Sequence, residues 1–169
     1  MTHAKNKVKW CLRKAEKELK TGKHRGLVKV KPSKEQTIKH IKKAEHNLKV
    51  TLYLKRGHFT DWCSSSLFYT IYHCFLAILA KHGYESRNQE CTLALIASLI
   101  EDGKLLLSLE DLEKVGSLDI KESQESTTAL KLREEYQYST EVTLKDKEYE
   151  DLLELAKRIL DVSKGVVEE

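Results

Sequence analysis

The chain has 169 residues, which suits one domain, or one domain with an extension, and is enough to bury a hydrophobic core. Its seven glycines and single proline leave few positions for tight turns and hairpins, so the composition favours an all-α fold. The N-terminus is basic and polar without an apolar core, which excludes a secretory signal. The apolar run from Leu67 to Ala80 is too short to cross a bilayer. We therefore expect a cytoplasmic protein with no membrane segment.

The net charge of +4 conceals a strong asymmetry along the chain. Residues 1–58 contain 18 Lys and Arg against four Glu, a net charge of +14, and the remainder of the chain carries −10. Such a division indicates a basic surface that faces a polyanion. The alternative is that the lysines only keep the outer helix faces soluble.

Apolar residues recur at helical spacing in most of the chain. The first helix, from Ala4 to Leu19, has a basic outer face, and Leu27–Lys31 alternates apolar and basic residues as a short extended piece does. Ser33 and Gln36 form a capping-box signal, which starts a helix that ends near residue 57. Later helices are predicted at about residues 60–83, 90–100, 129–138 and 144–162, with a short helix or a turn at 112–118.

These segments predict two parts. Residues 1–32 would form the basic N-terminal helix and the short extended lead-in, and residues 33–169 an up-and-down bundle of four to five helices. The helix that begins near Trp62 is apolar or aromatic on almost every side, which is typical of the centre of a bundle. Within it, Tyr69, Tyr72 and His73 are unusual, because a buried phenol or imidazole costs stability unless its polar atoms find partners. We expect these three residues to be mostly buried, as a polar network in the core or as the wall of a site.

The four cysteines, Cys11, Cys63, Cys74 and Cys91, stand far apart and include no C-x-x-C pair. We expect them to be free thiols in a reducing cytoplasm. Because the histidines also lack ligand spacing, no zinc or other metal site is predicted.

Several segments, taken together, resemble the HEPN superfamily of small helical domains, in its archaeal-type branch. They are Ala44-Glu45-His46-Asn47-Leu48, the aromatic helix from Trp62 to Gly83, Cys91-Thr92, and Arg133-Glu134-Glu135-Tyr136-Gln137-Tyr138. Trp10-Cys11-Leu12 and the stretch Leu27–Ser33 are similar to the lead-in of the same branch, so the resemblance covers nearly the whole chain. Each motif is weak alone, and the resemblance rests on their order. It implies an all-helical bundle that forms a homodimer, binds RNA or a nucleotide, and pairs with a small nucleotidyltransferase.

Many HEPN proteins are metal-independent ribonucleases that use an arginine and a histidine with four to six residues between them. The histidine transfers protons near neutral pH, and the arginine stabilises the charge that develops on the phosphate. None of the six arginines in this chain has a histidine at that spacing. After Arg133 the position is taken by Tyr138, whose phenol is a poor base at neutral pH, and Gln89 stands where the branch carries another histidine. The candidates for residual catalysis are Arg133 and His73, and a satisfied core residue is the alternative for His73.

A binding role fits the same region better. Arg133, Gln137 and Tyr138 lie at one end of a helix, where they can pair with a phosphate, bond a base edge and stack on a base. The alternative is that Arg133 pairs with a helix carboxylate and Tyr138 packs in the core. Further candidates for phosphate or base contacts are Arg87 and Asn88 in a polar loop and Lys39, Lys42 and Lys43 on an outer helix face.

The sequence thus predicts a catalytically degenerate HEPN protein that binds RNA or nucleotide phosphate and needs no cofactor. Two alternatives stay open: a metal-independent ribonuclease, as the toxin of a toxin–antitoxin pair, and a non-enzymatic protein-interaction adaptor.

Overall fold

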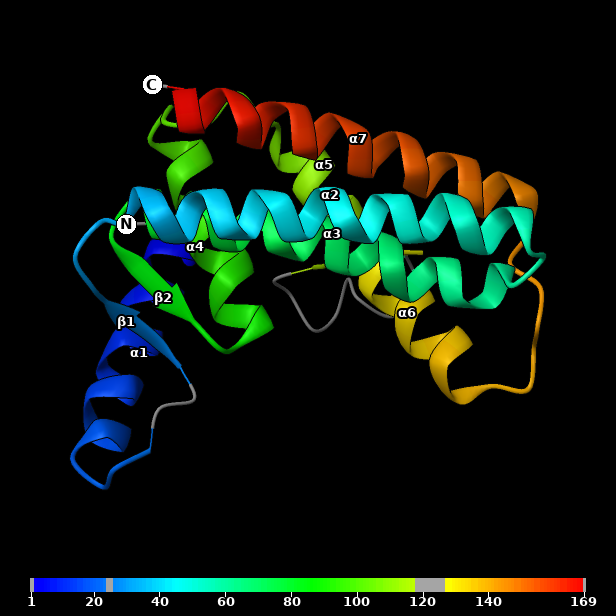
Figure 1. The fold of residues 1–169 in the computed structure, drawn as a ribbon. Helices are drawn as coiled ribbons and strands as arrows, with labels where there is room; N and C mark the ends of the chain where they lie inside the picture. The colour runs from blue at the N-terminus through cyan, green and yellow to red at the C-terminus, as the bar shows by residue number, and fades with distance from the viewer. Residues whose placement is uncertain (1, 24–25, 118–126, 169) are drawn as a thin grey trace.

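Seven helices and a two-stranded sheet make up the parts of the chain that the computed structural model describes, residues 2–23, 26–117 and 127–168. The predicted all-α class is confirmed. In chain order the elements are α1 (His3–Leu19), β1 (Leu27–Lys29), α2 (Lys34–Arg56), α3 (Thr60–Lys81), β2 (Tyr84–Ser86), α4 (Gln89–Glu101), α5 (Leu109–Val115), α6 (Ala129–Tyr138) and α7 (Asp146–Glu168). Residue 118, the predicted end of the short helix or turn that begins at residue 112, lies outside the described residues. The long helices α2, α3 and α7 lie side by side, α6 and α4 contact α3, and α1 stands at one end beside the sheet (Figure 1).

Local sequence signals set the ends of α2. Ser33 is its N-cap, and the Ser33 Oγ accepts a hydrogen bond from the Gln36 backbone N–H at 3.2 Å, as the capping-box signal predicts. The start of α3 is different, because Phe59 precedes it without a side-chain cap. The hydroxyl of Thr60 accepts a hydrogen bond from the Leu144 N–H at 3.0 Å instead. That bond ties the connection before α7 to the beginning of the central helix.

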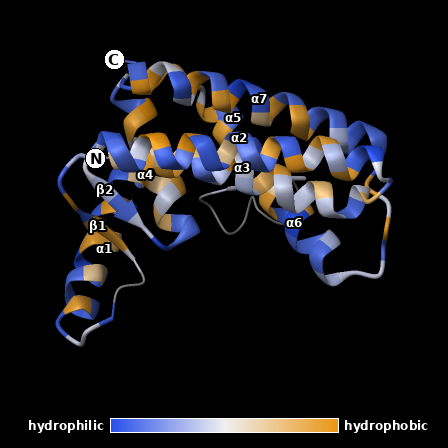
Figure 2. Ribbon diagram, viewed as in Figure 1, coloured by the Kyte–Doolittle hydropathy of each residue, from blue (hydrophilic) through white to orange (hydrophobic). Residues whose placement is uncertain are grey.

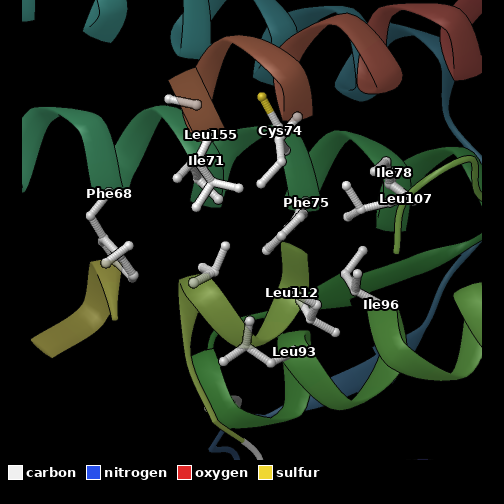
Figure 3. Close-up of a cluster of buried hydrophobic side chains, with 14 of the residues drawn as sticks. Phe68, Ile71, Cys74, Phe75, Ile78, Leu93, Ile96, Leu107, Leu112 and Leu155 are labelled. Carbon is white, nitrogen blue, oxygen red and sulfur yellow. The ribbon is translucent and has the colours of Figure 1, made fainter. Parts of the chain in front are cut away.

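Helix α3 is the centre of the core. Its Leu67, Ile71 and Phe75 side chains are fully buried. Ile71 and Cys74 lie towards Leu155 of α7, whereas Phe75 points the other way, towards α4 and α5 (Figure 3). Helices α2 and α7 alternate apolar and polar residues, as amphipathic helices on the outside of a bundle do (Figure 2). A helix packed from several sides needs apolar residues on several sides, which explains the near-continuous apolar pattern of α3.

By length and composition alone, α3 could cross a membrane, since it is 22 residues long. The sequence argument that its apolar run is too short therefore does not hold. Burial is the better argument, because 67% of its most apolar window is covered by the rest of the fold, as in the core helix of a soluble protein.

The two short strands form an antiparallel pair in which Leu27 lies opposite Ser86 and Lys29 opposite Tyr84. Strand β1 falls within the predicted extended piece, but β2 was expected to be loop. At three residues it is too short to show the alternation that identifies a strand. Gly83 links α3 to β2 with a φ of +77°, and a Cβ at this position would lie 2.9 Å from the Val30 carbonyl oxygen. Glycine is therefore required at this turn.

The prediction of four free thiols is wrong for two of them. Cys11 of α1 and Cys91 of α4 form a disulfide, although they are 80 residues apart in the sequence. Both lie on helix faces that pack together, and only this packing brings the sulfur atoms within reach. Cys63 and Cys74 are free and buried, and burial raises their pKa values to about 11 and about 12. These two remain neutral thiols at physiological pH.

Candidate functional site

Two aromatic side chains of α3 are open to solvent. Trp62 is 58% exposed and Tyr69 is 38% exposed, while Tyr72 and His73 are half-buried. The prediction that the polar aromatic residues are mostly buried is therefore wrong for Tyr69. Trp62 and Tyr69 are seven residues apart, which places them on the same side of the helix about 10 Å apart along its axis. We call Trp62, Tyr69 and the neighbouring Arg133 the aromatic face.

Arg133 is folded into this face. Its side chain is only 12% exposed, and its guanidinium lies over the Phe68 ring with 5.0 Å between the guanidinium carbon and the ring centroid. One terminal nitrogen donates a hydrogen bond to the Tyr69 hydroxyl, and the other contacts the Glu134 carboxylate, both at 3.2 Å. The Nε is buried and has no hydrogen-bond partner. The cation is thus held against aromatic rings by α3, with one exposed carboxylate beside it.

The other members of the predicted binding group do not converge with Arg133. Gln137 lies one turn further along α6 on the same side, and it is exposed. Tyr138 is 79% exposed and lies five residues after Arg133, roughly 140° around the helix. Tyr138 therefore does not pack in the core, and it does not share a pocket with Arg133.

A histidine pair lies further along α3. The Nδ1 of His73 is 3.0 Å from the Nδ1 of His40 on α2, so a single proton can lie between the two rings. Burial, with smaller effects of His40 and Lys43, lowers the pKa of His73 to about 4. Burial also lowers the pKa of His40, partly offset by the carboxylate of Glu85. Both rings are therefore neutral at pH 7.

Sequence reasoning missed His40. It stands among lysines on a helix whose outer face is polar, and nothing in the local pattern distinguishes it from a solvated residue. The contact could have been found only from the antiparallel arrangement of α2 and α3. That arrangement places the N-terminal half of α2, with His40, against the C-terminal half of α3, with His73. Among the residues with described positions, no group of three or more His, Cys, Asp or Glu side chains could hold a metal ion.

The histidine pair adjoins a cavity of about 520 Å³ that also contains Arg87. We call this cavity the sheet pocket, because β2 and the segment that follows β1 form one wall. Its lining comes from that segment, α2, α3, β2 and the residue after β2, with Val30, Lys31, Ser33, Gln36, His40, Leu76, Ala80, Tyr84, Glu85, Ser86 and Arg87. The Arg87 guanidinium contacts the Glu85 carboxylate at 3.3 Å.

The remaining predicted contacts lie near the sheet pocket or on α2. Asn88 is the N-cap of α4, where its Oδ1 accepts a hydrogen bond from the Cys91 N–H at 2.9 Å. Lys39 forms an ion pair with Glu35, at 2.5 Å, one turn earlier on α2. Lys42 and Lys43 are exposed. The structure therefore brings Arg87 and His40 to the same cavity, whereas Arg133 of α6 packs against another part of α3.

Comparisons with known proteins give one result of substance. A family model of the HEPN domain matches residues 38–166, which is well over half of the chain and begins inside α2. The matched segment contains α3, α4, α5, α6 and nearly all of α7, whereas α1 and β1 precede it. No curated protein matches the chain significantly.

Proposed function

We propose that this chain, which belongs to the HEPN family, binds RNA or nucleotide phosphate without cleaving RNA. The observation that carries the proposal is the aromatic face, where Trp62 and Tyr69 of the central helix stay exposed and Arg133 of α6 donates a hydrogen bond to the Tyr69 hydroxyl. Exposed aromatic rings can stack on nucleic acid bases, because every base offers a flat face. The net charge of +14 on residues 1–58 supplies long-range attraction for a polyanion.

The positions of the catalytic candidates favour binding over cleavage. The guanidinium of Arg133 is engaged with Phe68, Tyr69 and Glu134. The Nδ1 of His73 is engaged with His40, and a histidine with a pKa of about 4 is a weak base. No contact in the described residues joins Arg133 to His73.

Single-stranded RNA incubated with the purified protein at neutral pH in a metal chelator is expected to stay intact. The reason is that no arginine has a histidine at the spacing that the ribonucleases of this family use. Gel electrophoresis of labelled RNA, with binding measured in the same samples, tests this prediction. Cleavage that disappears in Arg133→Ala would establish the alternative, a ribonuclease toxin, and His40 and His73 would then be the first residues to test as its base.

Trp62→Ala and Tyr69→Ala are each expected to weaken RNA binding roughly 5- to 150-fold, since stacking of one base on an aromatic ring contributes about 1–3 kcal/mol. The dependence of affinity on salt should not change, because neither residue is charged. Tyr69→Phe keeps the ring and should bind nearly as well as the natural protein. Leu106→Ala, at a fully solvated position, is the control for a change of exposed apolar surface.

Charge-removing substitutions separate this stacking contribution from the electrostatic one. Lys9, Arg13 and Lys17 are exposed on α1, and their replacement by Gln should lower the slope of log affinity against log salt by up to about 2. Deletion of residues 1–31 is a poorer test, because it also removes β1 and Cys11. If the aromatic and charge variants all bind as the natural protein does, the RNA proposal is wrong.

A protein-interaction adaptor is the second candidate, and a specific surface favours it. Tyr53, Phe59 and Trp62 are all more than half exposed at the corner between α2 and α3. Such a patch suits a second copy of this chain, in keeping with the homodimer that we expect, or a nucleotidyltransferase as the partner protein. Sedimentation across a dilution series distinguishes self-association from a monomer that needs another partner.

We place the protein in the cytoplasm. The buried disulfide is unusual there, although intracellular proteins of hyperthermophiles are a known exception. Whether the disulfide persists in millimolar reduced glutathione tests this placement.

A further inference from the structure

The sheet pocket has the size and the mixed lining of a small-molecule site. Its volume of about 520 Å³ falls within the usual range for ligand pockets. Val30, Leu76 and Ala80 supply apolar surface, and Ser33, Gln36 and Ser86 supply hydrogen-bonding groups. The pocket is thus suited to a molecule that has both a polar and an apolar part.

The charged residues of the pocket favour an anion. Two cationic side chains, Lys31 and Arg87, and the neutral imidazole of His40 reach it from three parts of the chain, and Glu85 is the one acidic residue among the described residues of its lining. From these observations we propose that the sheet pocket binds a small phosphomonoester. Lys31, His40 and Arg87 surround the phosphate, and the apolar side chains contact the rest of the ligand. This site is independent of RNA binding at the aromatic face.

Arg87 has the geometry that phosphate recognition needs. A guanidinium offers two parallel N–H donors, which match two phosphate oxygens. Its contacts with the Glu85 carboxylate, from Nε and from a terminal nitrogen, are both 3.3 Å long. Charged pairs of good geometry are closer to 2.7–2.9 Å, so a phosphate can compete for these donors. Glu85 holds the guanidinium at the pocket but also repels an anion.

The histidine pair fixes the donor that His40 can offer. Since the Nδ1 atoms of His40 and His73 share one proton, the ring nitrogen of His40 left for a ligand is Nε2. When His73 donates that proton, His40 carries its own on Nε2 and can donate it to a phosphate oxygen. The charged and titratable groups around His40 are Glu85, Arg87 and Lys31 in the pocket lining and His73 on α3. Lys43, three residues after His40 on α2, acts on the pKa of His73. His73 is therefore a positioning residue for His40.

The apolar lining explains why the expected ligand is an ester rather than free phosphate. Inorganic phosphate would satisfy the basic side chains but would leave Val30, Leu76 and Ala80 facing water. A sugar phosphate or a nucleoside 5′-monophosphate would cover them, and burial of apolar area stabilises the complex. We therefore expect at least one of these two esters to bind at least tenfold more tightly than inorganic phosphate.

Isothermal titration of the full chain with inorganic phosphate, a sugar phosphate and a nucleoside 5′-monophosphate tests the proposal. Arg87→Gln should weaken binding of the ester about 10- to 150-fold, the effect of losing charged hydrogen bonds worth about 1.5–3 kcal/mol. Glu85→Gln should strengthen it, because the substitution removes the like charge. Arg56→Gln is the matched control, since Arg56 is exposed at the opposite end of α2.

A cavity-filling variant separates a pocket from a charged surface. Leu76→Trp should abolish ester binding while every charge is kept. Failure of all three probes to bind the natural protein would overturn the proposal, and so would a Leu76→Trp variant that still binds. Thermal melts show that each variant is folded. RNA binding, measured in parallel, should be unchanged in Leu76→Trp, so the two proposals can fail separately.

Discussion

Replacing both disulfide cysteines, Cys11→Ala with Cys91→Ala, is expected to lower the free energy of unfolding by about 2–4 kcal/mol. The disulfide joins residues 80 apart, and cross-links that close long loops restrict the unfolded chain most. Helix α1 has few other anchors. It packs mainly on α4 and β1, and its ion pairs, Lys5 with Asp102 and Lys7 with Glu90, are partly exposed and therefore weak. Denaturant unfolding gives the change in stability, and hydrogen exchange shows whether α1 opens before the bundle does.

A reductant supplies the control for this prediction. Dithiothreitol should destabilise the natural protein by a similar amount and should have no effect on the double variant. A natural protein whose unfolding curve is the same with and without the reductant would contradict the assigned role of the disulfide.

Phe75→Ala is expected to cost about 3–5 kcal/mol, the usual range for removing a buried phenylalanine. Phe75 is fully buried on the central helix and faces α4 and α5 (Figure 3). The cavity that the substitution leaves lies in the core, where no side chain from the surface can move in to fill it. Because small domains are stable by about 5–15 kcal/mol, this one change removes a large part of the total. Phe59→Ala deletes the same atoms at a mostly exposed position and should cost less than about 1 kcal/mol. Equal losses in the two variants would mean that α3 is not the centre of the core.

The correct predictions depend on signals between residues that are close together in the sequence. The capping box of Ser33 and Gln36 lies within four residues, and the apolar pattern of α3 lies within one helix, so both are visible in the sequence alone. Strand β2 escaped prediction because three residues carry almost no periodic signal, and it exists only where β1 pairs with it.

The candidate site could be predicted less well, because its geometry depends on which helices meet. Arg133 was identified from its place in a family motif, but its stacking on Phe68 follows from the packing of α6 on α3. The exposure of Tyr69 was missed for a related reason: composition shows how apolar a helix is, not which side of it stays uncovered. The contact of His40 with His73 and the disulfide join residues 33 and 80 positions apart, and no local pattern connects them.

The order of synthesis gives the β1–β2 pairing a further consequence. A ribosome makes α1 and β1 before α2 and α3, but their main partners, β2 and α4, are made only after those two helices. Helix α1 and strand β1 therefore stay incompletely packed until α4, which ends at Glu101, has been made. They dock as a late addition to a hairpin of α2 and α3 that can already pair while synthesis continues.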